Sequence, residues 1–135
     1  MTAYTLPAPD APGEQWGRLA VSLPGWRWMP RMYDGGRRQT ILAGGRSGAI
    51  SAVFPTRPGL RSDRWPDPDD PATEGCMMRL LTRTCWIHRA AVLPLGAVVT
   101  VETPDGRTVT GRGSTLGRAC IAAAAALGRW PGGGE

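Results

Sequence analysis

Apolar residues recur at the spacing of a helix face, i, i+3, i+4 and i+7, in several stretches of the chain. The first stretch predicts a short helix over residues 14–22, which ends before Pro24. A second helix is predicted to begin at Pro71, because Asp70 suits the capping position and proline fits the first helical turn. This helix should run to about Thr84 or a little further. Its predicted buried stripe consists of Cys76, Met77, Leu80, Leu81 and Thr84.

A last helix is predicted near the end of the chain. Ser114 or Thr115 provides a side-chain cap, and the apolar positions continue through Leu127. Gly128 suits the left-handed residue that ends many helices. The many alanines of this segment allow the helix to lie close to a sheet.

Strand patterns occupy the stretches between these helices. Residues 26–29 alternate large apolar and polar side chains, which predicts a first strand with both indoles on one side. Residues 39–43 and 49–54 predict a hairpin around a glycine-rich connection. Residues 98–102 and 108–112 predict a second hairpin around a turn that contains proline and glycine. Together the elements predict an α+β fold: a small antiparallel sheet, built from two hairpins or a meander plus a hairpin, with two main helices packed on one side.

The length of 135 residues predicts one domain, which we place at residues 14–130. Residues 1–13 and 131–135 carry few apolar side chains and are predicted to be flexible tails. Residues 55–69 hold four prolines and several charges, which predicts a long proline-rich surface loop.

Composition changes how the charge is interpreted. A net charge of +5 favours contact with phosphate groups, but all 16 basic residues are arginine and lysine is absent. A GC-rich genome explains that bias, and the arginines are scattered, so we interpret most of them as solvated surface. No segment approaches the roughly 20 apolar residues that cross a bilayer, and no secretory signal is evident. We therefore expect a cytoplasmic protein with three reduced cysteines and no membrane partner.

No catalytic or metal site is expected. His88, the only histidine, has one nearby candidate ligand in Cys85, whereas a structural zinc ion takes four ligands. No nucleophile or orienting acid accompanies His88 in a known catalytic pattern. Helix capping and a solvated loop explain the acidic cluster better than paired catalytic carboxylates do. That cluster consists of Asp63, Asp67, Asp69, Asp70 and Glu74. We therefore expect neither an enzyme nor a bound cofactor.

Aromatic and basic residues suggest two alternative binding surfaces. The first candidate, for a protein partner, combines tryptophan and arginine as binding hot spots do. It consists of Trp26, Arg27, Trp28, Arg31 and Trp65. The tryptophans are equally suited to form the core of a domain with a single phenylalanine.

The second candidate surface is for nucleic acid and consists of Arg37, Arg38, Arg112 and Arg118. The hairpin, the Gly-x-Gly at residues 111–113 and the alanine-rich helix resemble the end of a double-stranded-RNA-binding domain. Leu116 and Gly117, however, occupy the places of the basic pair that grips phosphate in that domain.

Two segments carry a more specific resemblance. They are Leu-Pro-Gly-Trp-Arg-Trp-Met-Pro-Arg-Met at residues 23–32 and Pro-Asp-Pro-Asp-Asp-Pro-Ala-Thr-Glu-Gly-Cys-Met-Met-Arg-Leu-Leu at residues 66–81. The chain from about Leu19 onward resembles a family of small proteins encoded by bacteriophages and prophages of GC-rich bacteria. Arg31 stands where such proteins usually have glycine, and Met77-Met78 where they favour leucine.

The resemblance implies a phage accessory protein and no particular activity. The sequence contains no catalytic pattern, and it is rich in tryptophan and arginine. Both observations favour binding over catalysis as the mode of action. We expect the protein to bind a macromolecule without catalysis, in the first place a host protein, for example one that takes part in defence. Nucleic-acid binding is the alternative function, and a small enzyme of unknown type is the third.

Overall fold

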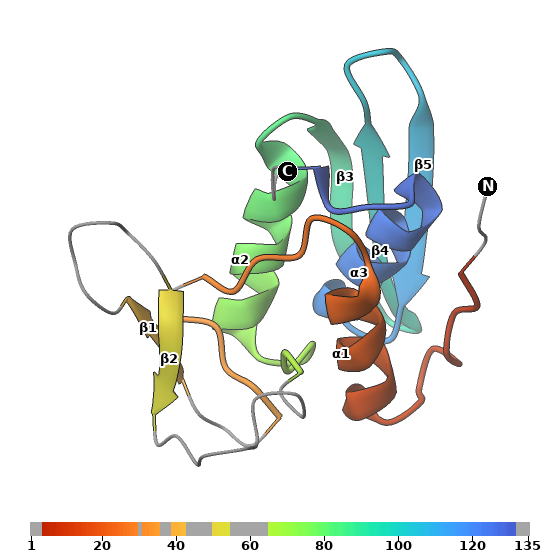
Figure 1. Cartoon of the computed structure of the whole chain (residues 1–135). Coiled ribbons are helices and arrows are strands. Elements are labelled where there is room, and N and C mark those ends of the chain that lie inside the picture. Colours follow the sequence, from red (N-terminus) through yellow and green to blue (C-terminus); the bar gives the residue numbers. More distant parts are fainter. Residues whose placement is uncertain (1–3, 30, 36–38, 43–49, 55–64, 132–135) are drawn as a thin grey trace.

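The computed structural model describes residues 4–29, 31–35, 39–42, 50–54 and 65–131. Within these residues, three helices gather on one face of a three-stranded antiparallel sheet, and two more strands pair separately (Figure 1). The elements are α1 Gly13–Ser22, β1 Gln39–Leu42, β2 Ile50–Phe54, α2 Pro71–Thr82, β3 Trp86–Leu93, β4 Gly96–Glu102, β5 Thr108–Gly113 and α3 Leu116–Leu127. The predicted α+β fold is confirmed.

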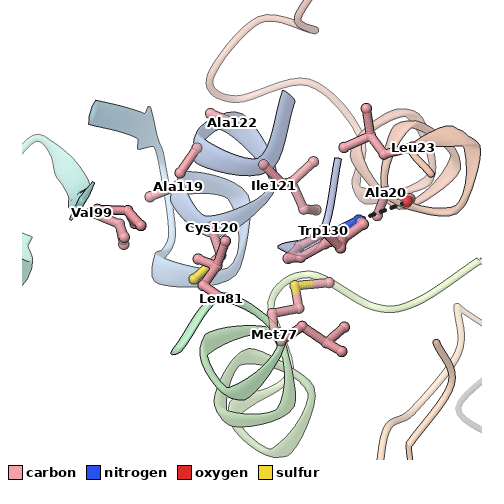
Figure 2. Packing of buried hydrophobic residues seen from close by; sticks show 14 of the residues in the cluster. Ala20, Leu23, Met77, Leu81, Val99, Ala119, Cys120, Ile121, Ala122 and Trp130 are labelled. Atoms are coloured by element: carbon pink, nitrogen blue, oxygen red, sulfur yellow. Dashed lines mark hydrogen bonds between the residues drawn. The ribbon is translucent and has the colours of Figure 1, made fainter. Parts of the chain in front are cut away.

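The core is built around α3, whose residues 117–124 are all buried. This helix packs against β4 and β5 on one side and against α1 and α2 on the other. In Figure 2, Ala119 points toward Val99 of the sheet, whereas Cys120 lies near Leu81 of α2. Trp130 closes the core behind the helix, and its Nε1 donates a hydrogen bond to the Ala20 carbonyl oxygen at 3.0 Å.

A glycine allows β5 and α3 to approach each other closely. A Cβ atom added at Gly111 would collide with the Ala119 carbonyl oxygen and with the backbone of Ala123. Because backbone meets backbone at this point, no rotation of a side chain relieves the collision. The Gly-x-Gly that resembles an RNA-binding motif in sequence therefore serves helix packing in this fold.

Both long helices begin at the predicted caps. The Asp70 carboxylate accepts a hydrogen bond from the Thr73 amide at 2.9 Å, with Pro71 in the first turn. Thr115 accepts a hydrogen bond from the Arg118 amide at 3.3 Å, and Gly128 ends α3 in the left-handed region with φ of 85°.

The prediction for α2 was too long at its end. The helix stops at Thr82 instead of reaching Thr84, because the chain turns there into β3. Its buried residues are Thr73, Met77, Leu80 and Leu81. Thr84 is exposed and Cys76 is only half-buried, so both were wrongly placed in the buried stripe.

Strand β3 was missing from the sequence prediction. It forms one edge of the sheet in the order β3-β4-β5 and pairs with β4 from Trp86 to Leu93. The register shifts between Ile87 and Arg89, so His88 is the extra residue of a β-bulge. The hairpin of β4 and β5 is confirmed, and Val99 and Val101 belong to the buried core.

Residues 26–29 form no strand, and the prediction of one was wrong. Trp26 turns back instead, with its amide hydrogen-bonded to the Leu23 carbonyl oxygen at 3.4 Å. The two indoles do lie together, because the rings of Trp26 and Trp28 meet edge to face at 5.5 Å. They cover the core directly, so this segment needs no partner strand.

The first predicted hairpin is present as the antiparallel pair of β1 and β2. Its connection at residues 43–49 and most of the predicted loop, residues 55–64, lie outside the described residues. Where the described chain resumes, the Trp65 carbonyl oxygen accepts a hydrogen bond from the Gly35 amide at 2.9 Å. The Asp67 amide donates to the Tyr33 carbonyl oxygen at 2.8 Å, so this part of the loop is held against residues 33–35.

The described part of the predicted N-terminal tail contacts the body. Arg118 of α3 donates to the carbonyl oxygen of Pro9 at 3.0 Å and also to that of Ala11. The Trp16 indole N–H donates to the Ala8 carbonyl oxygen at 2.9 Å. Residues 4–12 therefore share hydrogen bonds with two helices. None of the helices in the described residues is long and apolar enough to span a bilayer.

Candidate interaction surfaces

The tryptophans of the predicted protein-binding surface pack mainly inward. Trp26 and Trp28 are half-buried against the core, and Trp26 meets Trp130 edge to face at 5.5 Å. The indole nitrogen of Trp26 is buried without a hydrogen-bond partner among the described atoms. These two indoles therefore contribute to the packing of the core.

The other three members of that surface lie in different settings. Trp65 is half-buried, and its ring lies so close to Gly17 and Gly35 that a Cβ atom at either position would collide with it. Arg27 and Arg31 are exposed, and neither makes a hydrogen bond or an ion pair with a described residue. Of the five residues of the predicted surface, Arg27 and Arg31 are thus the two that are exposed.

The thiol beside Arg31 is not activated. Cys76 lines an open groove of about 590 Å³ on α2, between Arg31 and Arg79. Burial raises the pKa of this thiol even though the two arginines oppose the shift. A protonated thiol is a weak nucleophile, so the groove lacks the chemistry of a reactive cysteine.

The arginines of the nucleic-acid alternative do not form one patch. Arg37 and Arg38 lie outside the described residues. Arg118 is only 7% exposed and forms a bidentate pair with Asp69, through Nε at 3.0 Å and Nη2 at 2.9 Å. A guanidinium in that position is not accessible to phosphate. Arg112 is exposed on β5 and makes no side-chain hydrogen bond or ion pair to a described residue.

His88 forms a pair with Glu102 at the bulge of β3. Its Nε2 lies 2.5 Å from the Glu102 Oε1 in an open cleft of about 470 Å³. Trp86 and Ile87 complete that lining. A hydrolytic pair also needs a nucleophile, and no third described side chain hydrogen-bonds to either group. Among the described residues, no group of three histidine, cysteine or acidic side chains is placed to hold a metal ion.

The described members of the acidic cluster hold the fold together. Asp70 caps α2, and the Glu74 carboxylate accepts a hydrogen bond from the Gly117 amide at 3.2 Å. Burial would raise the pKa of Asp69, but the hydrogen bonds from Arg118 and Thr115 and the charge of Arg118 outweigh it, so the pKa is lowered. For Glu74, burial dominates and raises the pKa. Asp63 lies outside the described residues.

A run of exposed apolar side chains on and after β3 was missed by sequence reasoning. Of the five large apolar residues that are exposed among those described, four lie between positions 86 and 95. They are Trp86 at 60%, Val92 at 74%, Leu93 at 39% and Leu95 at 101% relative exposure. With Arg89 of the same strand they form what we name the β3 edge surface. The available signal was the apolar run before Pro94, which no helix pattern explains.

Backbone groups accompany these side chains. Within the described residues β3 pairs with β4 alone, so its outer edge is open. Pairing is regular from Arg89 to Leu93, and in an antiparallel ladder alternate N–H and C=O groups of an edge strand point away from the sheet. The β3 edge surface therefore offers both hydrogen bonds and apolar contacts.

In comparisons with known proteins, no protein-family model matches the chain, and no curated protein or solved structure shows significant similarity to it.

Proposed function

We propose that the protein is an accessory protein of a bacteriophage or prophage, which acts without catalysis by binding a host protein through the β3 edge surface. The phage origin rests on the sequence resemblance at residues 23–32 and 66–81. The mode of action rests on one structural observation, the concentration of exposed apolar side chains along an edge strand whose outer side has no partner among the described residues.

An exposed edge of this kind is a liability unless a partner covers it. Proteins usually protect edge strands with lysine, proline, inward charges or bulges, because unpaired strands recruit other chains. Here the bulge at His88 and the charge of Arg89 protect only the beginning of β3. The other end, which leads into Leu95, is apolar and open. An extended segment of a partner can therefore add a strand along Arg89–Leu93.

The tip of the β3–β4 hairpin supplies the apolar anchor. Complete burial of one leucine side chain contributes about 1.5–3 kcal/mol. Leu95 is fully exposed in the free protein, so its burial in a partner's pocket yields nearly all of that contribution. Leu95 is therefore the expected hot spot of the interface, and Leu93, which is 39% exposed, adds a smaller contribution.

Nucleic-acid binding has weaker support. Of its four predicted arginines, only Arg112 is both described and accessible. Binding to phosphate weakens steeply with salt, whereas an apolar strand interface changes little with salt. A gel shift measured at two salt concentrations therefore distinguishes the two functions.

Affinity capture from a lysate of a GC-rich bacterial host tests the proposal. The immobilised wild-type protein is compared with L93E and L95E, which place a charge at the apolar tip. S22E is the control, because it places the same charge at Ser22, an exposed residue at the end of α1 outside the β3 edge surface. We expect wild type and S22E to retain the same host protein at raised salt, and L93E and L95E to lose it.

Two outcomes contradict the proposal. One is that no host protein is retained by the wild type in gentle buffer. The other is equal retention by all four proteins, which would place the contact elsewhere. Circular dichroism shows whether each variant is folded, so that a loss of binding is not mistaken for a loss of structure.

A further inference from the structure

A groove lies at the opposite edge of the sheet from the β3 edge surface. Its volume is about 500 Å³, within the range of protein sites that take small ligands or peptide side chains. Residues of α3, β5, the turn before β5 and the N-terminal segment line it. They are Tyr4, Leu6, Arg107, Thr110, Arg112, Ala122, Ala125, Ala126, Leu127 and Gly128.

One wall of the groove is an edge strand. β5 ends the sheet order, and within the described residues it pairs with β4 alone. Every second residue of such a strand directs its N–H and C=O away from the sheet. In Figure 1 the N-terminal segment runs past this side of β5, and no β-bridge joins β5 to the described part of that segment. With respect to the described chain, the outer backbone groups of β5 are therefore available to another extended segment.

The floor of the groove is apolar and shallow. Ala122, Ala125 and Ala126 stand at i, i+3 and i+4 on one face of α3, and Ala126 is exposed. Methyl groups leave room for the side chains of a segment that lies along the helix. Leu6 adds a larger, exposed apolar side chain to the lining.

The charge at the rim is positive. Arg112 is exposed and has no ion-pair partner among the described residues. Arg107 donates a hydrogen bond to the Leu127 carbonyl oxygen at 3.3 Å and shares its turn with Asp105, whose charge it partly balances. The two arginines are five residues apart, which is about 17 Å along a strand. Arg112 is thus the unbalanced cation of the groove.

We propose that this groove binds an extended acidic peptide segment of a partner protein, which adds a strand to the edge of β5. The segment would lay apolar side chains on the alanines of α3 and direct a carboxylate to Arg112. This site is separate from the β3 edge surface, so the protein has one binding edge at each side of its sheet.

Two fluorescent peptides of eight residues test the groove by anisotropy. Both carry six alternating valines and threonines, flanked by glutamates in one peptide and by lysines in the other. We expect the glutamate peptide to bind more tightly by about tenfold or more, the effect of one charge-assisted hydrogen bond. The variant R112E should reverse that preference, and A126W should remove binding by filling the groove from an exposed helix position.

The variant R89E is the matched control, because Arg89 is a second exposed arginine on the other edge strand. It should bind the glutamate peptide as the wild type does, and so should L95E, which abolishes only the function of the β3 edge surface. In amide NMR spectra, the peptide should shift residues 108–113 and 122–128. Equal binding of both peptides, binding unaffected by A126W, or shifts confined to residues 89–95 would overturn the proposal.

Discussion

At the scale of single residues, the backbone of Arg31 adopts an unusual left-handed conformation. Arg31 has φ of 82°, the one positive value among the described residues that are not glycine. Glycine is the residue that most readily adopts this conformation, and composition and periodicity carry no signal for the turn.

Replacing Arg31 by glycine should stabilise the protein. An L residue in the left-handed region costs about 1–2 kcal/mol, and the added chain entropy of glycine offsets about 0.5–1 kcal/mol of the gain. We expect R31G to raise the free energy of unfolding by about 0.5–1 kcal/mol in urea. The control R27G, at a neighbouring exposed arginine without positive φ, should not stabilise. A lower stability of R31G than of wild type would contradict this account.

Arg118 is the residue whose role differs most from the sequence prediction. It was assigned to a phosphate-binding set, but it joins α3 to Asp69 and to two carbonyl oxygens of the N-terminal segment. Its sequence neighbours give no hint of this, because its partners are 49 and more than 100 positions away. We expect R118M to lose about 2–3 kcal/mol of unfolding free energy, and the exposed R112M to change by less than about 0.5 kcal/mol.

The same contact predicts a dependence of stability on pH. The pKa of Asp69 is lowered from 3.8 in the folded state, so its contribution is fully present above that value and disappears as the pH falls through the lower folded pKa. Because Asp69 is partly solvated, the effect is modest. Urea titrations between pH 6 and pH 3 should show wild type losing part of its advantage over R118M, because the hydrogen bonds from Arg118 to the Pro9 and Ala11 carbonyl oxygens do not titrate. A constant difference down to pH 3 would contradict this role.

At the scale of elements, helices were predictable where local signals coincide. The caps at Asp70 and Thr115 and the stop at Gly128 are all in place. β3 escaped prediction because the bulge at His88 interrupts the alternation of side chains that marks a strand. Residues 26–29 show the reverse error. The alternation there reflects contacts between indoles, and no strand in the described part of the chain pairs with this segment.

The contact between β5 and α3 gives a prediction at this scale. G111A should destabilise the protein by about 1–3 kcal/mol, because its methyl group meets the backbone of α3. Gly75 is the matched control, since it lies inside α2 with no atom within 4 Å of an added Cβ. G75A should gain about 0.5–1 kcal/mol through helix propensity. Thermal unfolding of both variants measures the contrast, and equal stability of G111A and wild type would contradict the close packing.

At the scale of the whole molecule, the sequence predicted the layers but not the surface. Six tryptophans suggested a binding site, yet Trp16 and Trp130 are buried and Trp26 and Trp28 are half-buried against the core. Only Trp86 is mainly exposed among the described tryptophans. Which aromatic side chain faces solvent depends on the order of the strands, and that order cannot be obtained from local patterns once β3 is overlooked.

The most direct measurement compares the two candidate protein-binding surfaces on one captured host protein. Affinity is measured for wild type, for L95E at the β3 edge surface, and for the double variant R27E/R31E at the surface predicted from sequence. The account predicts that L95E weakens binding by at least about tenfold while R27E/R31E changes it by less than about threefold. Unchanged binding of L95E together with loss of binding by R27E/R31E would contradict it.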